Sequence, residues 1–299
     1  MRTTLILLIT CSFVQVCAQS AVEKTPISLV DNFIFISVSV NEHEKPLNFL
    51  FDTGAGITVI HSKMAEQLKL EVTTESKIAT SGKTLLSKES EGNTLKIGGS
   101  LLLDSVSLIF MDLSHISDYI KVEVDGVIGY DLLKNVITET NLDALEMRFY
   151  DREEFNPAST HEKLVWLESN LFGLPVDVTP KKGTDEILLV LQIDSGADNF
   201  LTFHNKTIRE HGLMDSDRRY KSRQGFGADS TITSNLKSRV YGVTFAERTW
   251  KNVTVTLEVD PINHRTNSLA DGLIGQRILN DFNITYDLKE GNVFFEKRK

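Results

Sequence analysis

The sequence predicts an all-β protein with short helices, folded as two similar lobes. Three observations lead to this fold class. Short segments rich in β-branched and aromatic residues recur along the chain between polar or glycine-containing turns, as is typical of β-strands. The same order of motifs occurs in the first half and again in the second half. With 41% hydrophobic residues and only 6 prolines in 299 residues, the composition is that of a folded protein large enough for two cores.

The first 18 residues are predicted to be an export signal. Arg2 supplies the positive start, an apolar stretch follows from Leu5, and Val16-Cys17-Ala18 places small residues before a cleavage site at Gln19. The stretch is too short to span a membrane. We therefore expect an exported protein, periplasmic or extracellular, with no membrane span. A lipid anchor on Cys17 is the alternative.

The charge and the metal-binding residue types exclude several classes of partner. Both cysteines lie in the predicted leader, so the mature chain would have no disulfide. Removal of Arg2, one of 32 basic side chains, leaves 41 acidic ones and a net charge of about −10. Such a surface repels polyphosphate, so no nucleic acid is expected as a partner. The seven histidines are scattered without a metal-binding spacing, so no metal and no cofactor is expected.

The first half is predicted to contain strands at residues 32–40, 47–51 and 58–60, followed by a short helix at 62–70. Ser62 is the expected N-cap of this helix, because a serine hydroxyl can accept a hydrogen bond from the first turn. The stretch from 78 to 110 gives only short strand signals, because several glycines, with Gly92 among them, interrupt it.

The second half repeats this order, with a strand at 200–203, a helix at 206–211, and strands around 241–243 and 253–257. Each half is expected to close with two strands joined by a turn. These closing hairpins are predicted at 136–150 and 283–296.

The most informative feature is an apolar strand that ends in an aspartate, and it occurs twice. One copy ends in Asp52-Thr53-Gly54-Ala55 and the other in Asp194-Ser195-Gly196-Ala197. Two carboxylates held close together can share one proton, because repulsion moves their pKa values apart. One carboxylate can then act as a base toward water while the other donates a hydrogen bond to a carbonyl group. Asp52 and Asp194 are therefore the predicted catalytic pair.

The residues that follow each aspartate are predicted to support the pair. The hydroxyl groups of Thr53 and Ser195 can form hydrogen bonds across the pair and make both loops rigid. Gly54 and Gly196 allow backbone to approach a carboxylate closely, which a Cβ would obstruct.

A second motif follows each aspartate at nearly the same distance. Asp125-Gly126-Val127-Ile128-Gly129 begins 73 residues after Asp52 (125 − 52). Asp271-Gly272-Leu273-Ile274-Gly275 begins 77 residues after Asp194 (271 − 194). The aspartates that open this motif are interpreted as strand-end or turn residues, since an acid before glycine commonly has that role.

The two D-[TS]-G-A sequences resemble the active-site loops of aspartic peptidases, the pepsin and retroviral-protease group. The resemblance covers nearly the whole mature chain, and within the family the chain is similar to bacterial exported aspartyl proteases. It implies two pseudo-symmetric pepsin/retropepsin-like β-barrel lobes with the active-site cleft between them. The second motif resembles the element that packs behind the catalytic loop in this family. Ile128 and Ile274 would hold the loops, and Gly129 and Gly275 would permit close backbone contact.

The resemblance and the repeat together divide the chain into a signal peptide at 1–18, an N-terminal lobe at 19–152, a linker at 153–169 and a C-terminal lobe at 170–299. Whether residues 164–167 belong to the linker or form a strand between the lobes is left open. Because both aspartates lie on one chain, a monomer can form the pair, with a peptide or protein as substrate.

The family resemblance also implies a flap that closes over the peptide and excludes water. The candidates are Ser81 and Gly82 in the first half and Phe226 and Gly227 in the second half. The first-half candidate has no convincing flap tyrosine, which departs from pepsin. Two ordinary surface hairpins are the alternative.

Asp198 follows Asp194 by four residues and could add negative charge near the cleft. One hypothesis is that it raises a pKa of the pair or favours a basic substrate side chain. The alternative is a solvated carboxylate that caps a loop.

The predicted function is that of an exported aspartic endopeptidase, which hydrolyses peptide bonds with water activated between two aspartates. A catalytically silent module of the same fold, binding peptide or glycan between its lobes, is the first alternative. A glycosidase, which also uses paired carboxylates, is the second.

Overall fold

The computed structural model describes residues 21, 23–43, 45–80, 84–157, 161–214, 219–227, 230–259 and 269–299. The predicted signal peptide at 1–18, including Cys17, lies outside these ranges, as do the flap candidates Ser81 and Gly82. Within the described ranges, no helix combines the length and the apolar character needed to cross a bilayer.

The first lobe is built on an eight-stranded sheet. Its strands are β2 (Ser28–Val30), β3 (Phe33–Val40), β4 (Leu47–Phe51), β5 (Thr58–His61), β6 (Thr74–Ala79), β7 (Thr84–Ile97), β8 (Leu101–Met111) and β9 (Gly126–Ile128). They are hydrogen-bonded in the order β2-β3-β4-β9-β5-β8-β7-β6, and β3 also pairs with β7. Three short helices accompany the sheet: α1 (Ser62–Gln67), α2 (Ser114–Ile120) and α3 (Tyr130–Leu133).

The second lobe repeats the first. Its strands are β13 (Val165–Trp166), β14 (Phe172–Thr179), β15 (Ile187–Asp194), β16 (Leu201–Phe203), β17 (Lys221–Phe226), β18 (Ile232–Phe245), β19 (Arg248–Glu258) and β20 (Gly272–Gly275). Their order, β13-β14-β15-β20-β16-β19-β18-β17, is that of the first sheet with every strand number raised by eleven, and β14 pairs with β18 as β3 pairs with β7. The helices are α4 (Asn205–Glu210) and α5 (Gln276–Leu279).

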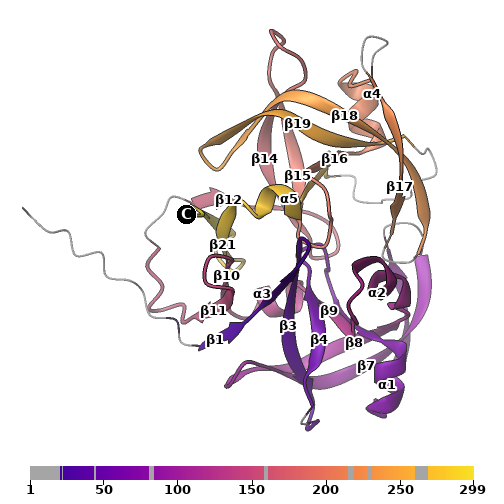
Figure 1. The fold of residues 1–299 in the computed structure, drawn as a ribbon. Helices are drawn as coiled ribbons and strands as arrows, with labels where there is room; N and C mark the ends of the chain where they lie inside the picture. The colour runs from indigo at the N-terminus through magenta and orange to yellow at the C-terminus, as the bar shows by residue number, and fades with distance from the viewer. Residues whose placement is uncertain are drawn as a thin grey trace, which may run out of the picture.

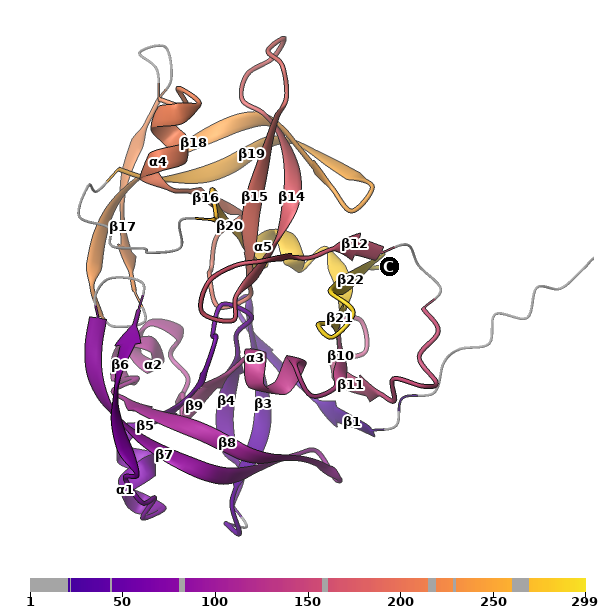
Figure 2. The same cartoon turned by 180° about the vertical axis from the view of Figure 1, so that it is seen from behind.

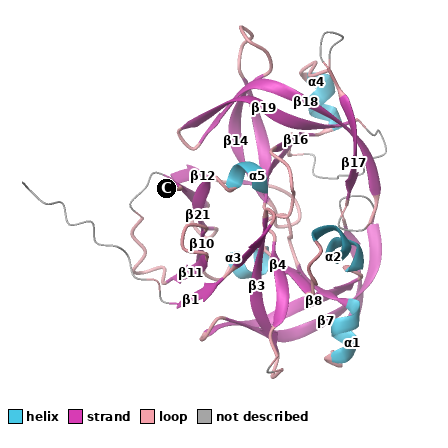
Figure 3. Ribbon diagram, in the orientation of Figure 1, coloured by secondary structure: helices cyan, strands magenta, loops and turns pink. Residues whose placement is uncertain are grey.

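A third sheet joins the two lobes along one side of the molecule (Figures 1 and 3). It contains β1 (Glu23–Pro26), β10 (Ile137–Asn141), β11 (Glu146–Tyr150), β12 (His161–Lys163), β21 (Phe282–Asp287) and β22 (Asn292–Lys297). The order is β1-β11-β10-β21-β22-β12, so the halves meet where β10 pairs with β21. This pattern confirms the predicted all-β fold with two pseudo-symmetric lobes.

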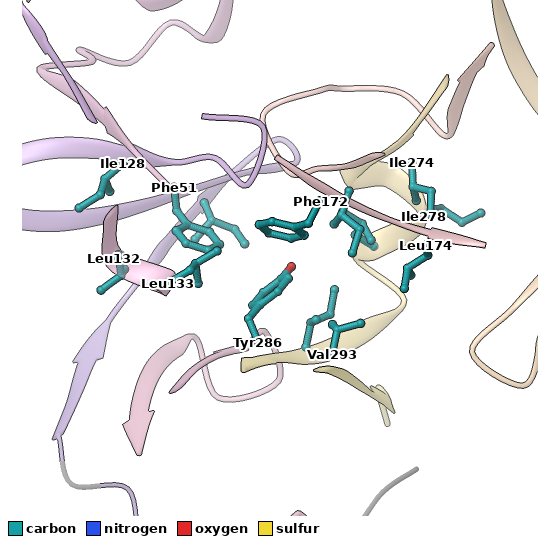
Figure 4. Packing of buried hydrophobic residues seen from close by; sticks show 14 of the residues in the cluster. Phe51, Ile128, Leu132, Leu133, Phe172, Leu174, Ile274, Ile278, Tyr286 and Val293 are labelled. Atoms are coloured by element: carbon teal, nitrogen blue, oxygen red, sulfur yellow. The ribbon is translucent and has the colours of Figure 1, made fainter. Parts of the chain in front are cut away.

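Aromatic packing connects all three sheets near the first catalytic loop (Figure 4). The Tyr286 ring of the shared sheet lies 6.3 Å from the Phe51 ring and 6.2 Å from the Phe172 ring, measured between centroids. Phe51 ends β4, and Phe172 begins β14 of the other lobe. Such ring pairs each stabilise a fold by about 0.5–1.5 kcal/mol beyond the area that they bury. The cluster therefore fixes the end of β4, and with it the position of Asp52.

Two details of the predicted elements are wrong. The N-cap of α1 is His61 and not Ser62, because the His61 Nδ1 accepts a hydrogen bond from the Lys63 N–H at 3.2 Å. Gly92 does not break a strand. It adopts a φ of 73° inside β7, where the register to β8 shifts, so it forms a bulge in a strand that continues to Ile97.

The predicted linker at 153–169 contains two strands. β12 pairs with β22 at the edge of the shared sheet, and β13 pairs with β14 in the second lobe. Of the stretch 164–167, Val165–Trp166 is thus part of the second lobe's sheet.

Candidate active site

The strands β4 and β15 deliver two aspartates to the junction of the lobes. Asp52 directly follows β4, and Asp194 is the last residue of β15. Each strand runs parallel to the strand of the second motif, β9 or β20. Ile128 and Ile274, which are fully buried, end or nearly end those strands, and the Ile128 carbonyl accepts a hydrogen bond from the Asp52 N–H at 2.9 Å.

Four hydrogen bonds link the two aspartate loops in a symmetric pattern. The Thr53 N–H donates to the Ser195 hydroxyl oxygen, and the Ser195 N–H donates to the Thr53 hydroxyl oxygen, both at 2.9 Å. The Thr53 hydroxyl donates to the Ile193 carbonyl at 2.9 Å, and the Ser195 hydroxyl donates to the Phe51 carbonyl at 3.1 Å. Both hydroxyl residues are buried. Loops 142 residues apart in sequence are thereby held in one rigid unit.

Each aspartate lies against the glycine of the opposite loop. A Cβ added to Gly54 would lie 2.9 Å from the Asp194 carboxyl carbon, and one added to Gly196 would overlap the Asp52 carboxyl group. The structure therefore brings Asp52 and Asp194 together. A side chain at Gly54 or Gly196 would push the opposite aspartate away. A Cβ on Gly129 would likewise overlap the Asp52 carbonyl oxygen.

The environment of Asp52 favours its protonated form. Burial and then the negative charge of Asp194, which also forms a hydrogen bond with it, raise the pKa of Asp52 to about 7. The N–H groups of Gly54 and Gly196, at 2.7 and 3.1 Å, lower this pKa only in part. Both donors bind the same carboxyl oxygen, Oδ1, which leaves Oδ2 for a proton. The pair therefore holds one proton in mildly acidic solution.

A comparison with protein families agrees with this geometry. A family model described as aspartyl protease matches residues 36–132. This part of the chain is similar to aspartyl proteases. The matched segment contains Asp52 and the second motif of the first lobe up to Gly129. The second half lies outside the matched segment and repeats the strand order of the first half. A comparison with curated proteins gave no match.

The aspartates that open the second motif have a structural role in the peptidase fold. The Asp125 carboxylate accepts a hydrogen bond from the Asn48 N–H, and the Asp271 carboxylate accepts one from the Val190 N–H, both at 2.8 Å. Asn48 and Val190 lie on β4 and β15, four residues before the catalytic pair. Each carboxylate thus fastens the strand that positions Asp52 or Asp194 in its lobe.

Asp198 does not have either of the roles considered from the sequence. Its carboxylate forms two hydrogen bonds with the Arg277 guanidinium, at 2.7 and 3.0 Å. It also accepts hydrogen bonds from Asn32 at 2.9 Å and from the Tyr119 hydroxyl at 3.3 Å. Burial alone would raise the pKa of Asp198, but these partners, Arg277 above all, outweigh burial and lower it. Asp198 is therefore an ionised and compensated group.

This ion pair also connects the lobes of the peptidase. Arg277 belongs to α5 in the second lobe, whereas Asn32 and Tyr119 belong to the first. The hypothesis of a free negative charge was wrong because the partner of Asp198 lies 79 residues away in sequence. An arginine two residues after Gly275 was the only sequence signal that could have suggested it.

The described flap candidates lie at the end of a hairpin. Phe226 is the last residue of β17, and Gly227 begins the turn to β18, with its N–H donating to the Thr231 carbonyl at 2.8 Å. The corresponding hairpin of the first lobe is β6–β7. The two hairpins approach each other on the side of the molecule opposite the shared sheet (Figures 1 and 2).

The described residues contain no group of three or more histidine, cysteine, aspartate or glutamate side chains arranged to hold a metal ion.

Proposed function

We propose that the protein is an exported aspartic endopeptidase that hydrolyses peptide bonds with a water activated between Asp52 and Asp194. One observation carries the proposal. The two aspartate loops are locked together by reciprocal hydrogen bonds, and one of the paired carboxyl groups has its pKa raised to about 7. A pair that must share a proton is what general acid–base hydrolysis without a covalent intermediate requires.

The roles of the two carboxyl groups follow from their surroundings. Asp52, protonated on Oδ2, donates a hydrogen bond to the carbonyl oxygen of the scissile peptide. Asp194, ionised, accepts a proton from the water as the water oxygen bonds to the carbonyl carbon. Collapse of the tetrahedral intermediate then breaks the C–N bond, and a proton passes to the leaving amine nitrogen. The pair returns to its singly protonated state.

The rigid loops contribute by holding both groups in place before the substrate arrives. Reciprocal bonds between Thr53 and Ser195 remove the need to reorganise the pair during the reaction, which lowers the barrier. Activity should decline as pH rises through about 7, because the proton on Asp52 is then lost.

The proposal is tested with a mixed peptide library and mass spectrometry. Wild type should cut internal peptide bonds, whereas Asp52→Asn and Asp194→Asn should each lose cleavage and keep their fold. Asp104→Asn, a change of an exposed aspartate on β8, is the matched control and should cut as wild type does. Cleavage at the wild-type rate by either dyad variant would refute the proposal. Peptide binding without cleavage by wild type would favour the silent binding module instead.

Export and a monomeric state are part of the proposal. The sequence of the leader supports export, and the presence of both aspartates on one chain supports a monomer. N-terminal sequencing of the protein secreted by an expressing cell should begin at Gln19. A lipid-linked cysteine at position 17, lost in Cys17→Ser, would show a lipoprotein instead. Light scattering should give the mass of a single chain.

A further inference from the structure

A positively lined cavity lies beside the second aspartate loop. Its volume is about 190 Å³, and its walls include Asn199, Phe200, Arg223, Lys237, Arg277 and two threonines of β19. One water molecule takes up about 30 Å³ of liquid, so the cavity has room for a side chain with a carboxylate. Phe200 is 37% exposed and can cover the aliphatic part of such a side chain.

Two walls of the cavity come from segments that directly follow the second aspartate loop and its companion motif. Asn199 follows Asp194 by five residues, and its carbonyl accepts a hydrogen bond from the Arg277 N–H at 3.1 Å. Gly275, two residues before Arg277, pairs with Asp194. Arg223 lies on β17, the strand that carries the flap candidates of the second lobe. A group bound in this cavity would therefore contact residues that directly follow the second aspartate loop and its companion motif, and a residue of β17.

Three basic side chains, Arg223, Lys237 and Arg277, line the cavity of this acidic protein, and the charge of Asp198 opposes their mutual effect on Lys237 only in part. Asp198 neutralises Arg277, but within the described ranges no carboxylate forms an ion pair with Arg223 or Lys237. Burial, and then the charges of Arg223 and Arg277, lower the pKa of Lys237, so the charge on this ammonium is disfavoured by its surroundings. An anion would relieve this repulsion. The net charge of the chain, −9, makes this positive site stand out against its surface.

In the first lobe an acidic residue takes the position of Arg277. Asp131 follows Gly129 by two residues, as Arg277 follows Gly275. The Asp131 carboxylate is buried and accepts hydrogen bonds from the N–H and hydroxyl of Thr58 at 2.9 and 2.8 Å. A carboxylate in this position would repel a second one. Asp131 also forms an ion pair with Lys134 at 2.6 Å, so this position is basic on one side of the pseudo-symmetric dyad and acidic on the other.

We infer that this cavity is a substrate subsite for a carboxylate, supplied by an aspartate or glutamate side chain or by a free C-terminus. The inference rests on the proposed peptidase function and adds a substrate class to it. Arg223 offers a planar pair of N–H donors and Lys237 a compact ammonium, which together suit a carboxylate. The enzyme should thus prefer peptides that have an acidic group on one side of the scissile bond.

Matched peptides that differ only in Glu against Gln at each position test the inference. Wild type should cut the Glu peptide about tenfold faster at one position, the factor expected for one charge-assisted contact, and the ratio should shrink in high salt. Arg223→Met and Lys237→Met should each reduce this ratio toward one, and Lys237→Glu should make it favour Gln. Lys251→Met, a change of an exposed lysine on β19 outside the cavity, is the matched control and should keep the wild-type ratio. Two cavity variants on different strands guard against one of them failing to fold.

A second peptide pair, with a free or an amidated C-terminus, identifies the source of the carboxylate. Equal cleavage of Glu and Gln peptides together with equal cleavage of free and amidated peptides would overturn the inference and leave the peptidase proposal intact. Failure to cut any peptide would refute the peptidase proposal. In that case the preference of the cavity for a carboxylate is tested by peptide binding. Fluorescence anisotropy of labelled Glu and Gln peptides should still show preferential binding of the Glu peptide, reduced in Lys237→Met, and equal binding would overturn the inference.

Discussion

Replacing Asp52 by asparagine should stabilise the protein at neutral and alkaline pH while it removes the proposed activity. The pKa of Asp52 is about 7 in the folded chain, against 3.8 for an ordinary aspartate. Each pKa unit corresponds to about 1.36 kcal/mol, so a difference of about three units amounts to about 4 kcal/mol. Because Asp52 is partly exposed, solvent reduces this value, and we expect about 2–4 kcal/mol.

The sign of the effect follows from linkage. The folded state binds a proton at Asp52 more tightly than the unfolded state, so this contribution to stability is fully present below about pH 4. It is lost as pH rises toward 7, where the folded state must accommodate a negative charge on Asp52 beside that of Asp194. Asparagine carries no charge, and its carbonyl oxygen can still accept the hydrogen bonds from the N–H groups of Gly54 and Gly196.

Urea unfolding of wild type and Asp52→Asn at several pH values measures this prediction. The variant should gain stability relative to wild type between pH 4 and pH 7, and the gain should level off near pH 8 at about 2–4 kcal/mol. The exposed change Asp104→Asn should show no comparable pH dependence. A difference between Asp52→Asn and wild type that is the same at pH 4 and pH 8 would show that the pair does not retain a proton on folding, and the reasoning would then be wrong.

Three further changes test other parts of the site. Thr53→Ala leaves the Ser195 N–H buried without its acceptor and should lower the free energy of unfolding, measured by urea denaturation, by about 2–4 kcal/mol. Thr53→Ser keeps the hydroxyl and should not lower it. An alanine variant as stable as wild type would contradict the role of Thr53 in linking the loops. Gly129→Ala places a methyl group onto a carbonyl oxygen of the first loop and should prevent native folding, so a native circular dichroism spectrum with unchanged melting would contradict it. Arg277→Met leaves Asp198 unpaired and should cost about 1–3 kcal/mol at pH 7. That cost should shrink as acid protonates Asp198, because its pKa is lowered in the fold, and a pH-independent cost would argue against the ion pair.

Asp198 shows where reading of the sequence reaches its limit. The distance of four residues from Asp194 suggested only that it could lie near the pair. Its charge state, however, depends on Arg277 and on first-lobe groups, Asn32 and Tyr119, which only folding brings to it. An ion pair between residues 79 apart leaves no local pattern, because any of several arginines could have been the partner.

The edges of the shared sheet show the same limit for backbone pairing. β12 lies in a polar stretch that predicted a linker, yet it pairs with β22. β1 similarly pairs with β11 at the opposite edge. The unpaired N–H and C=O groups along the edge of the assembled sheet decide where a further strand can be added. Because these backbone groups are the same for every sequence, the amino-acid pattern does not indicate the pairing.

The amino-acid order by itself determined the two-lobe β architecture and the identity of the paired aspartates with their hydroxyl and glycine neighbours. These features are local and repeated, since strand periodicity, a carboxylate at a strand end and a glycine at a close approach each need only neighbouring residues. Tertiary structure alone decided that Thr53 and Ser195 exchange hydrogen bonds, that Asp198 is neutralised, and that Arg223 and Lys237 face a common cavity. Each of these depends on the distance between groups far apart in the chain, and electrostatic and hydrogen-bond energies follow that distance in space.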